Sequence, residues 1–416
     1  MRIVELAWRN LLRSPRRTLA SAMTLALGAA GLLMFQAFNE GIFTTWRENT
    51  IRIRYGHGEV TRVELESHRS ETPWEYWFDE HGIEDQLKRH STQLVELFPR
   101  VSFVGFLTRG AVTLAGRGEG VDPTRESSFF TSLNFIAGQD LAPPPHDSAD
   151  SDSAKLWIIL GKGLADALQA KPGDSILLSG QTHAGQMNGV QLIVRGVFHT
   201  GSHHFDNTFF RIPLSTAQSF LDTKKIERFA VRLQDRQLWP EFKATIQQAS
   251  VGTQLSLKSF EEIDQFYYGN VKRFLEAQFG VIRVIFLIIV GLGVLSTLSS
   301  SFLERAGELG ALRANGETRR RVWKIWFVES LLLGLIGGAI GVSVAYLIIL
   351  IGFPTGFDMP PGPGITREFR VHFILRPSHL AQALALSACA SALASQPAIW
   401  RLLRSPIPLL LGRNSQ

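Results

Sequence analysis

Four runs of apolar residues, each long enough to cross a membrane as a helix, constrain the fold of this chain most. About 20 apolar residues span the hydrocarbon core of a bilayer, and residues 19–38 and 284–303 each contain no charged side chain. Residues 326–352 form a longer run with one acid, Glu329. Residues 380–400 form a weaker run rich in Ala and Ser, and small residues let membrane helices approach closely. We therefore predict four transmembrane helices, the last of them closely packed.

A cleaved signal peptide is the alternative interpretation of the first run, because basic residues precede it. The apolar region of such peptides is only about 7 to 15 residues long. The first run is longer, and no small-x-small cleavage site is evident before the polar region that follows it. These two features favour a membrane helix.

The basic residues that flank the four runs predict the orientation of the chain. Lys and Arg accumulate in short segments on the cytoplasmic side of a membrane. Such residues precede the first run, separate the second run from the third, and follow the fourth: Arg2, Arg9, Arg13, Arg16, Arg17, Arg305, Arg313, Arg319, Arg320, Arg321, Lys324, Arg401, Arg404 and Arg413. We therefore predict a cytoplasmic interfacial segment at 1–18, a short cytoplasmic helix at 304–325 and a cytoplasmic tail at 401–416.

The net charge of +6 is then carried mostly by residues expected at the membrane surface. No basic run lies outside the flanks of the apolar runs, so the charge does not indicate nucleic-acid binding.

Residues 39–278 lie between the first two runs and are predicted to form a periplasmic domain. Alternating stretches that are typical of strands are interspersed with helical patterns, which indicates a mixed α+β fold. A segment of this length exceeds a common domain size, so we expect one subdomain from 55–105 with 225–260 and a second from 106–222. The expected fold is an α-helical membrane protein with four transmembrane helices and a large mixed α+β periplasmic domain between the first and second. Residues 353–379 would form a short outer loop.

An apolar stripe precedes the second run and predicts a stalk helix over 260–283. A helix that stays amphipathic outside the bilayer needs a partner for its apolar face. The outer domain or the same helix of a second subunit could supply that partner. The stripe recurs at steps of three and four residues: Phe260, Ile263, Tyr267, Val271 and Phe274.

No motif in the sequence indicates catalysis by this chain. The phosphate loop GxxxxGK[ST], the nucleophile motif GxSxG, and the HExxH, CxxC and EF-hand spacings are all absent. Cys389, the only cysteine, lies in the fourth run, so the outer domain has no disulfide. His199, His203, His204 and Asp206 occupy a polar turn without a matching metal-ligand spacing. We expect no catalytic residue, no metal site and no cofactor bound by this chain.

Glu329 is the one acid within the third run. Intramembrane acids are candidates for function by default. However, Glu329 lies only three residues beyond Trp326 and could reach the membrane interface. Surface anchoring and a role in coupling both remain open.

The charged segment, residues 304–325, is too charged to enter lipid and too short to form a domain. Its pattern resembles the R..E.G.LRA.G.TRR signature of the FtsX and MacB superfamily of ABC-transporter permeases, and the order of the four helices and the outer domain matches as well. Asn315 departs from the pattern, because the family usually has Ile or Leu there. The matching residues are Arg305, Glu308, Gly310, Leu312, Arg313, Ala314, Gly316, Thr318, Arg319 and Arg320.

Five stretches of the outer domain resemble the lipoprotein-releasing branch of that superfamily, the LolC and LolE type. They are GVDPTRE at 120–126, IILGKGLADAL at 158–168, KPGDSILL at 171–178, VRGVFHTGSHHFDN at 194–207 and IPLSTAQSFL at 212–221. These stretches are less specific than the pattern in the charged segment.

The resemblance implies a complex of two permease subunits and a dimer of cytoplasmic ABC ATPases, which would bind ATP and Mg. The second permease could be the same chain or a homologue. The charged segment would dock on the ATPase, with Leu309 and Leu312 as apolar anchors and Glu308 and Arg313 as polar contacts; a solvated loop that binds phospholipid heads is the alternative. The expected coupling residues are Glu304, Arg305, Glu308, Leu309, Leu312, Arg313 and Gly316.

The implied function is the extraction or release of lipoproteins or other amphiphiles from a bacterial inner membrane, with membrane lipids and a periplasmic carrier as further partners. A MacB-like exporter of peptides, siderophores or drugs, working with a periplasmic adaptor, is one alternative. An FtsX-like regulator that transmits force to a periplasmic hydrolase is another. A membrane-anchored receptor would explain the topology but not the pattern in the charged segment.

Overall fold

The computed structural model divides into two compact units. The first, called here the helical unit, comprises Met1–Thr45, Lys272–Asp358 and Arg370–Gln416; the second, the sheet unit, comprises Trp46–Val271 and Met359–Phe369. The structure describes residues 3–13, 15–65, 73–141, 156–249, 254–360 and 368–407.

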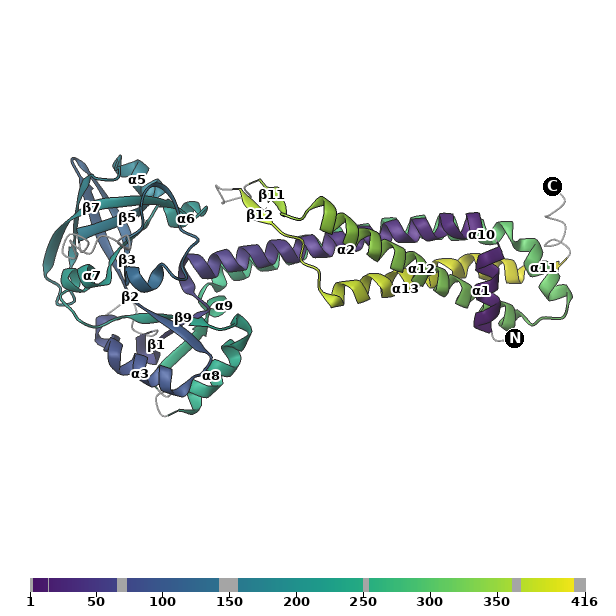
Figure 1. Ribbon diagram of the computed structural model, residues 1–416, viewed down its shortest axis with the longest axis horizontal. Helices are drawn as coiled ribbons and strands as arrows, with labels where there is room; N and C mark the ends of the chain where they lie inside the picture. Colours follow the sequence, from purple (N-terminus) through teal and green to yellow (C-terminus); the bar gives the residue numbers. More distant parts are fainter. Residues whose placement is uncertain are drawn as a thin grey trace. The chain divides into compact units, whose positions relative to one another are not determined.

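Long helices make up most of the helical unit (Figure 1). Among the described residues, four helices, α2, α10, α12 and α13, are long and apolar enough to cross a membrane, which confirms the predicted number of membrane helices. The bounds are α1 (Ile3–Arg13), α2 (Pro15–Thr50), α10 (Asn270–Glu304), α11 (Ala306–Ala314), α12 (Arg319–Gly352) and α13 (Pro377–Arg404).

Small residues bring α12 and α13 into close contact. A Cβ atom added at Gly334 would lie only 2.7 Å from the Cα of Ala388. Ser387 and Ser391 of α13 donate hydrogen bonds from their hydroxyl groups to the carbonyl oxygens of Gly334 (2.8 Å) and Ser330 (2.6 Å) of α12. The Ala and Ser residues of the fourth run therefore form a packing surface, as their composition predicts.

The sheet unit contains a ten-stranded sheet with the strand order β10-β1-β9-β2-β3-β8-β5-β7-β4, and β6 pairs with β2 and β7. The strands are β1 (Gly58–Arg62), β2 (Leu94–Arg109), β3 (Val112–Val121), β4 (Asn134–Gly138), β5 (Trp157–Gly161), β6 (Ser175–Gln181), β7 (Met187–His199), β8 (Phe209–Pro213), β9 (Arg228–Leu233) and β10 (Leu255–Ser259).

Strand β2 connects the two halves of this sheet. Its first half pairs with β9, its second half pairs with β6, and β3 runs alongside from Arg100 to Arg109. Helix α3 (Glu80–His90) packs against β2 and α8 (Trp239–Gln248) against β10, whereas α5 (Lys162–Leu168) packs against β3 and β5 and α7 (Leu214–Leu221) against β3 (Figure 1). The two subdomains expected from the sequence thus share β2 and one sheet.

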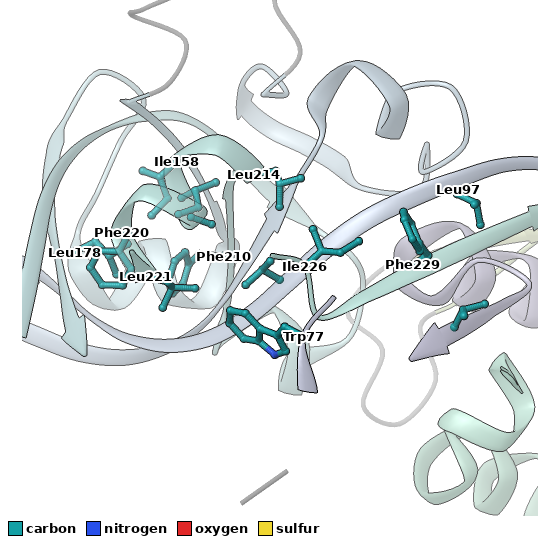
Figure 2. Close-up of a cluster of buried hydrophobic side chains, with 14 of the residues drawn as sticks. Trp77, Leu97, Ile158, Leu178, Phe210, Leu214, Phe220, Leu221, Ile226 and Phe229 are labelled. Atoms are coloured by element: carbon teal, nitrogen blue, oxygen red, sulfur yellow. The ribbon is translucent and has the colours of Figure 1, made fainter. Parts of the chain in front are cut away.

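One hydrophobic core extends through both halves of the sheet. It includes Leu257 of β10 at one end of the strand order and Val194 of β7 near the other. Figure 2 shows Trp77, Phe229 and Ile226 continuing toward Phe210 and Phe220 in this core. Burial of apolar surface is the main source of stability in such a domain, which has no disulfide. The large mixed domain between the first and second membrane helices is confirmed.

Shorter elements are also present in the described part of the chain. They are η1 (Ile51–Tyr55), η2 (Val63–Leu65), η3 (Pro73–Tyr76), α4 (Pro123–Glu126), α6 (His203–Asp206), η5 (Arg236–Leu238), α9 (Phe260–Ile263), η6 (Gln265–Gly269), β11 (Phe357–Met359) and β12 (Phe369–Val371).

The predicted stalk over 260–283 is not one regular helix. Helix α9 ends at Ile263. The next residue, Asp264, has a φ of −100° and a ψ of 41°, which are not helical, and the π-helix η6 follows before α10 begins. A π-turn contains more residues than an α-turn, so it rotates the side chains that follow it out of register. The expected continuous stripe is therefore wrong.

The charged segment also contains two elements where one helix is expected. Helix α11 ends at Ala314, and Gly316 adopts a φ of +86°, a conformation that favours glycine. The Thr318 side chain then accepts a hydrogen bond from the amide of Arg321 and caps the start of α12. The third membrane helix consequently begins at Arg319, well before the predicted residue 326.

Candidate coupling site

Helix α11 packs against the helical unit through its apolar side. Leu309 is fully buried in a cluster with Leu11 of α1, Trp326 of α12 and Leu402 of α13. Because its side chain lies in the chain's own core, Leu309 is not available as the predicted apolar anchor for an ATPase. Leu312 is half-buried at the edge of the same cluster.

Arg305 occupies the break between α10 and α11 and connects three helices. Its Nε donates to the Glu308 carboxylate at 2.8 Å, and its Nη1 donates to the carboxylate of Glu329 on α12. The other Glu329 oxygen accepts a hydrogen bond from Asn10 of α1 at 3.3 Å. Arg305 and Glu329 are both buried, and buried charges require such partners. Glu329 is therefore buried within the helical unit, where it binds Arg305 of the charged segment.

A small cavity adjoins this pair. Its volume is about 20 Å³, and a space of about 10–15 Å³ is enough for one water molecule. Polar side chains of Thr18, Ser21, Ser301 and Ser330 line it together with Arg305 and Glu329. Apolar side chains of Leu11, Leu298, Phe302 and Leu333 complete the lining. The cavity beside the charged pair is therefore polar on one part of its wall and apolar on another.

Arg313 binds the C-terminal end of α13. Its Nη1 donates to the carbonyl oxygens of Ser405 at 2.8 Å and Leu403 at 3.3 Å. The last carbonyl groups of a helix lack donors within the helix, and a cation there also interacts favourably with the helix dipole. Arg313 thus has a partner within its own chain, where the sequence analysis assigned it a contact with the ATPase.

The free surface of α11 is formed by other residues. Glu308, Ala311 and Asn315 are exposed and lie at steps of three and four residues, which places them on one face of a helix. Glu304 is exposed at the end of α10, and Gly316 is exposed after α11. Asn315 replaces an apolar family residue at an exposed position, where a polar side chain needs no buried partner.

The predicted stalk residues have different environments. Phe260 is buried beside Tyr268, whereas Phe274 is 68% exposed. Ile263 and Val271 are half-buried. The side chain of Tyr267 lies outside the part of the chain that the structure describes.

Two partners in the site, Asn10 and Trp326, are not among the residues predicted from the sequence. Asn10 shares the inward side of α1 with buried Ala7 and Leu11. A polar residue on the apolar side of an amphipathic helix is a signal that it has a buried partner. Trp326 stacks on Phe302 of α10, with ring centroids 4.8 Å apart, and was interpreted only as an interface residue.

The histidine-rich turn has an internal explanation. Asp206 accepts hydrogen bonds from the Thr200 amide (2.9 Å) and hydroxyl (2.8 Å), and its second oxygen lies 3.5 Å from Nε2 of His199. Among the described residues, no group of three or more His, Cys, Asp or Glu side chains could hold a metal ion.

The fold and the site define a membrane protein with four candidate membrane helices, a large mixed domain after the first of them, and a short helix between the second and third. Residues 18–249 match the model of the MacB-like periplasmic core domain, and residues 280–407 match the FtsX-like permease C-terminal model. The chain therefore belongs to the family of FtsX-like and MacB-like permeases, which confirms the resemblance found in the sequence.

The names of three curated relatives agree with this family. The chain is 22% identical over 349 residues to the lipoprotein-releasing system transmembrane protein LolC of Neisseria meningitidis, covering 82% of this chain and 78% of that protein. It is 30% identical over 161 residues to the macrolide export ATP-binding/permease protein MacB of Chromobacterium violaceum, covering 37% of this chain and 25% of that protein. It is 27% identical over 167 residues to the uncharacterized ABC transporter permease YknZ of Bacillus subtilis, covering 38% of this chain and 42% of that protein. The chain thus spans less than half the length of the MacB and YknZ relatives.

Two solved structures also resemble parts of the chain. The periplasmic region of MacB from Actinobacillus actinomycetemcomitans is 13% identical, with a TM-score of 0.36, and the match covers 50% of this chain and 90% of that one. The extracellular domain of YknZ from Gram-positive bacteria is 13% identical, with a TM-score of 0.34, and the match covers 48% and 98%.

Proposed function

We propose that this chain is the permease subunit of an ABC transporter in a bacterial inner membrane, and that a separate cytoplasmic ATPase dimer binds ATP and Mg. Both termini and α11 would then face the cytoplasm, and the sheet unit would lie in the periplasm beside a second permease subunit. The observation that carries this proposal is the attachment of α11: Leu309, Arg305 and Arg313 fix it to the membrane helices, while Glu308 and Ala311 stay exposed.

The exposed face of α11 suits a helix-in-groove contact with the ATPase. Ala311 lies between Glu308 and Asn315 and has a small side chain, so the backbone of α11 could approach the wall of a groove closely. The acid at Glu308 would favour a basic rim. Because Arg305 joins α11 to α12, movement of the ATPase groove would reach the membrane helices.

Replacement of Ala311 tests this docking face directly. Ala311→Arg places a long charged side chain in the middle of the face without touching the buried contacts of Leu309. We expect the variant to stay in the membrane and to lose co-purification with the ATPase. Glu5→Arg, at an exposed position on α1, serves as the control for an added positive charge. Unchanged co-purification of Ala311→Arg would refute docking through this face.

For the substrate, we propose lipoproteins or other amphiphiles of the inner membrane. The support is the alignment with the LolC relative over 82% of this chain. Depletion of the protein should then cause outer-membrane lipoproteins to accumulate in the inner membrane. The MacB relative supports an exporter that works with a periplasmic adaptor as the second candidate. Normal lipoprotein sorting after depletion would contradict the first candidate and favour the second.

A further inference from the structure

The first membrane helix ends inside the sheet unit. Helix α2 passes into the π-helix η1, which ends at Gly56 with a φ of +64°. The last carbonyl groups of a helix have no donor within the helix and need another partner. In η1, two of these carbonyl groups bind buried arginines: Arg211 donates from Nη2 to the oxygen of Ile53 at 3.0 Å, and Arg100 donates from Nη1 to the oxygen of Arg54.

Both arginines are held by buried carboxylates at the middle of the sheet. Arg100 of β2 binds Glu126 through two hydrogen bonds of 2.9 Å, from Nε and Nη2. Arg211 of β8 donates from Nε to Glu119 of β3 at 3.0 Å, and these two residues are direct partners in the register of β3 and β8. A guanidinium group with two such carboxylate bonds has a fixed orientation. The end of η1 is therefore bonded to β2 and β8, and through Glu119 to β3.

The two buried carboxyl groups of this cluster differ: burial raises the pKa of Glu126, whereas Glu119 is held in its charged form. Burial alone would raise the pKa of Glu119, but the positive charges of Arg100, Arg211 and Arg228 outweigh burial and hold the pKa well below its usual range. Apolar residues of similar volume often replace a buried ion pair without loss of stability. An apolar residue at these positions, however, could not donate a hydrogen bond to the carbonyl groups of η1.

We propose that Arg100 and Arg211 are positioning residues that clamp the outer end of the first membrane helix to strands β2, β3 and β8. The mechanical part of this inference rests on the proposed function: a displacement of α2 driven by the ATPase would enter the sheet unit at this clamp. The clamp itself is a property of the sheet unit and can be tested without the ATPase.

A matched control lies in the same cluster. Arg228 of β9 is as deeply buried as Arg211 and also binds Glu119. Its other hydrogen bonds and ion pairs join it to Glu59, Glu227 and Ser102. It lies near enough to Tyr55 of η1 for a charge interaction, but among the described residues it donates no hydrogen bond to a carbonyl group of η1. A purely structural charge cluster would respond similarly to the loss of either arginine, whereas a clamp would respond selectively to the loss of Arg211.

Hydrogen exchange of the full chain in lipid nanodiscs distinguishes these cases. In Arg211→Met, we expect the amides of residues 51–56 to exchange about tenfold faster or more, as for the loss of a charge-assisted hydrogen bond, while the central strands keep their protection. Arg228→Gln should leave the exchange rate of the amides of residues 51–56 unchanged relative to that of the strands. Unchanged exchange at 51–56 in Arg211→Met, or an equal increase in both variants, would overturn the clamp.

A milder variant covers the case in which Arg211→Met does not fold. Arg211→Lys keeps the charge beside Glu119 but lacks the forked donors that reach both Glu119 and Ile53, so it should show the same selective increase in hydrogen exchange at residues 51–56.

The mechanical role has its own test once the ATPase is identified. ATP should change hydrogen exchange in β2 and β3 of the wild type but not in those strands of Arg211→Lys. A selective increase at 51–56 with an unaltered ATP response would uphold the clamp and overturn its mechanical role. Absence of any ATPase partner would refute the proposed function and leave the exchange result standing.

Discussion

The guanidinium group of Arg305 donates a hydrogen bond to the carboxylate of Glu329, 24 residues further along the chain. Arg305 lies where α10 gives way to α11, and Glu329 lies on α12. The pair therefore connects the short exposed helix to a membrane helix. Asn10 adds α1 through its bond to the second oxygen of Glu329. Displacement of α11 must either carry α12 with it or break this bond.

Loss of one member of the pair should destabilise the helical unit. Arg305→Ala leaves the charge of Glu329 buried without its partner, which typically costs about 3–5 kcal/mol. The double variant Arg305→Met with Glu329→Leu removes both charges and should recover much of that loss. Thermal unfolding in detergent measures the effect, with exposed Arg320→Ala as the control. Additive losses in the double variant would contradict a direct pair.

Arg313→Ala should loosen the end of α13. The variant leaves the carbonyl groups of Leu403 and Ser405 without their donor and removes a cation near the C-terminal end of the helix dipole, an effect of about 1 kcal/mol. Hydrogen exchange should therefore increase at the last turn of α13 and stay unchanged in the middle of the helix. Unchanged exchange at the last turn would show that Arg313 does not cap α13.

Gly334→Val should disrupt the contact between α12 and α13. The added Cβ would lie 2.7 Å from the Cα of Ala388 and 2.8 Å from the Ser387 carbonyl oxygen, and overpacking of this kind costs about 1–3 kcal/mol. Gly291→Val on α10 is the control, because a Cβ there has no neighbour within 4 Å. The melting temperature in detergent should fall only for Gly334→Val. Equal effects of the two substitutions would contradict the packing described for α13.

Acid should weaken the sheet unit partly through His57. Burial and the charge of Arg236 lower the pKa of His57 from 6.5 to about 4, and its Nδ1 accepts a hydrogen bond from the Leu233 amide at 3.0 Å. Between these pH values the unfolded chain binds a proton at this side chain and the folded chain does not, so stability falls as pH falls from 6.5 towards 4. His57→Gln should show a smaller fall in melting temperature across that window. A fall as large as in the wild type would exclude His57 as a contributor.

The membrane helices could be predicted from the sequence because a run without charges is a local property. Which side chains of a short helix are buried could not be predicted in the same way. Leu309 and Ala311 are both compatible with an exposed face in the pattern, and only the packing of α1, α12 and α13 shows that Leu309 is inside. The π-helix before α10 was missed for a similar reason: the steps of three and four residues continue through it, and the break at Asp264 depends on the packing of Phe260 and Tyr268.

The buried bonds of Arg100 and Arg211 were also invisible in the sequence. Glu119 is 92 residues from Arg211 in the chain, and Glu126 is 26 residues from Arg100. Nothing in the local pattern distinguishes these four residues from exposed charged ones. Register between β3 and β8 brings Glu119 to Arg211, and such pairings depend on the tertiary fold.

The central claim is that ATP acting at α11 changes the sheet unit. Its most direct test is hydrogen exchange of the full chain in nanodiscs together with its ATPase, with and without a non-hydrolysable ATP analogue. We predict that the analogue changes exchange in residues 51–62 of the wild type, that Ala311→Arg abolishes this change, and that Glu5→Arg retains it. No change in the wild type, or the same change in Ala311→Arg, would contradict the account.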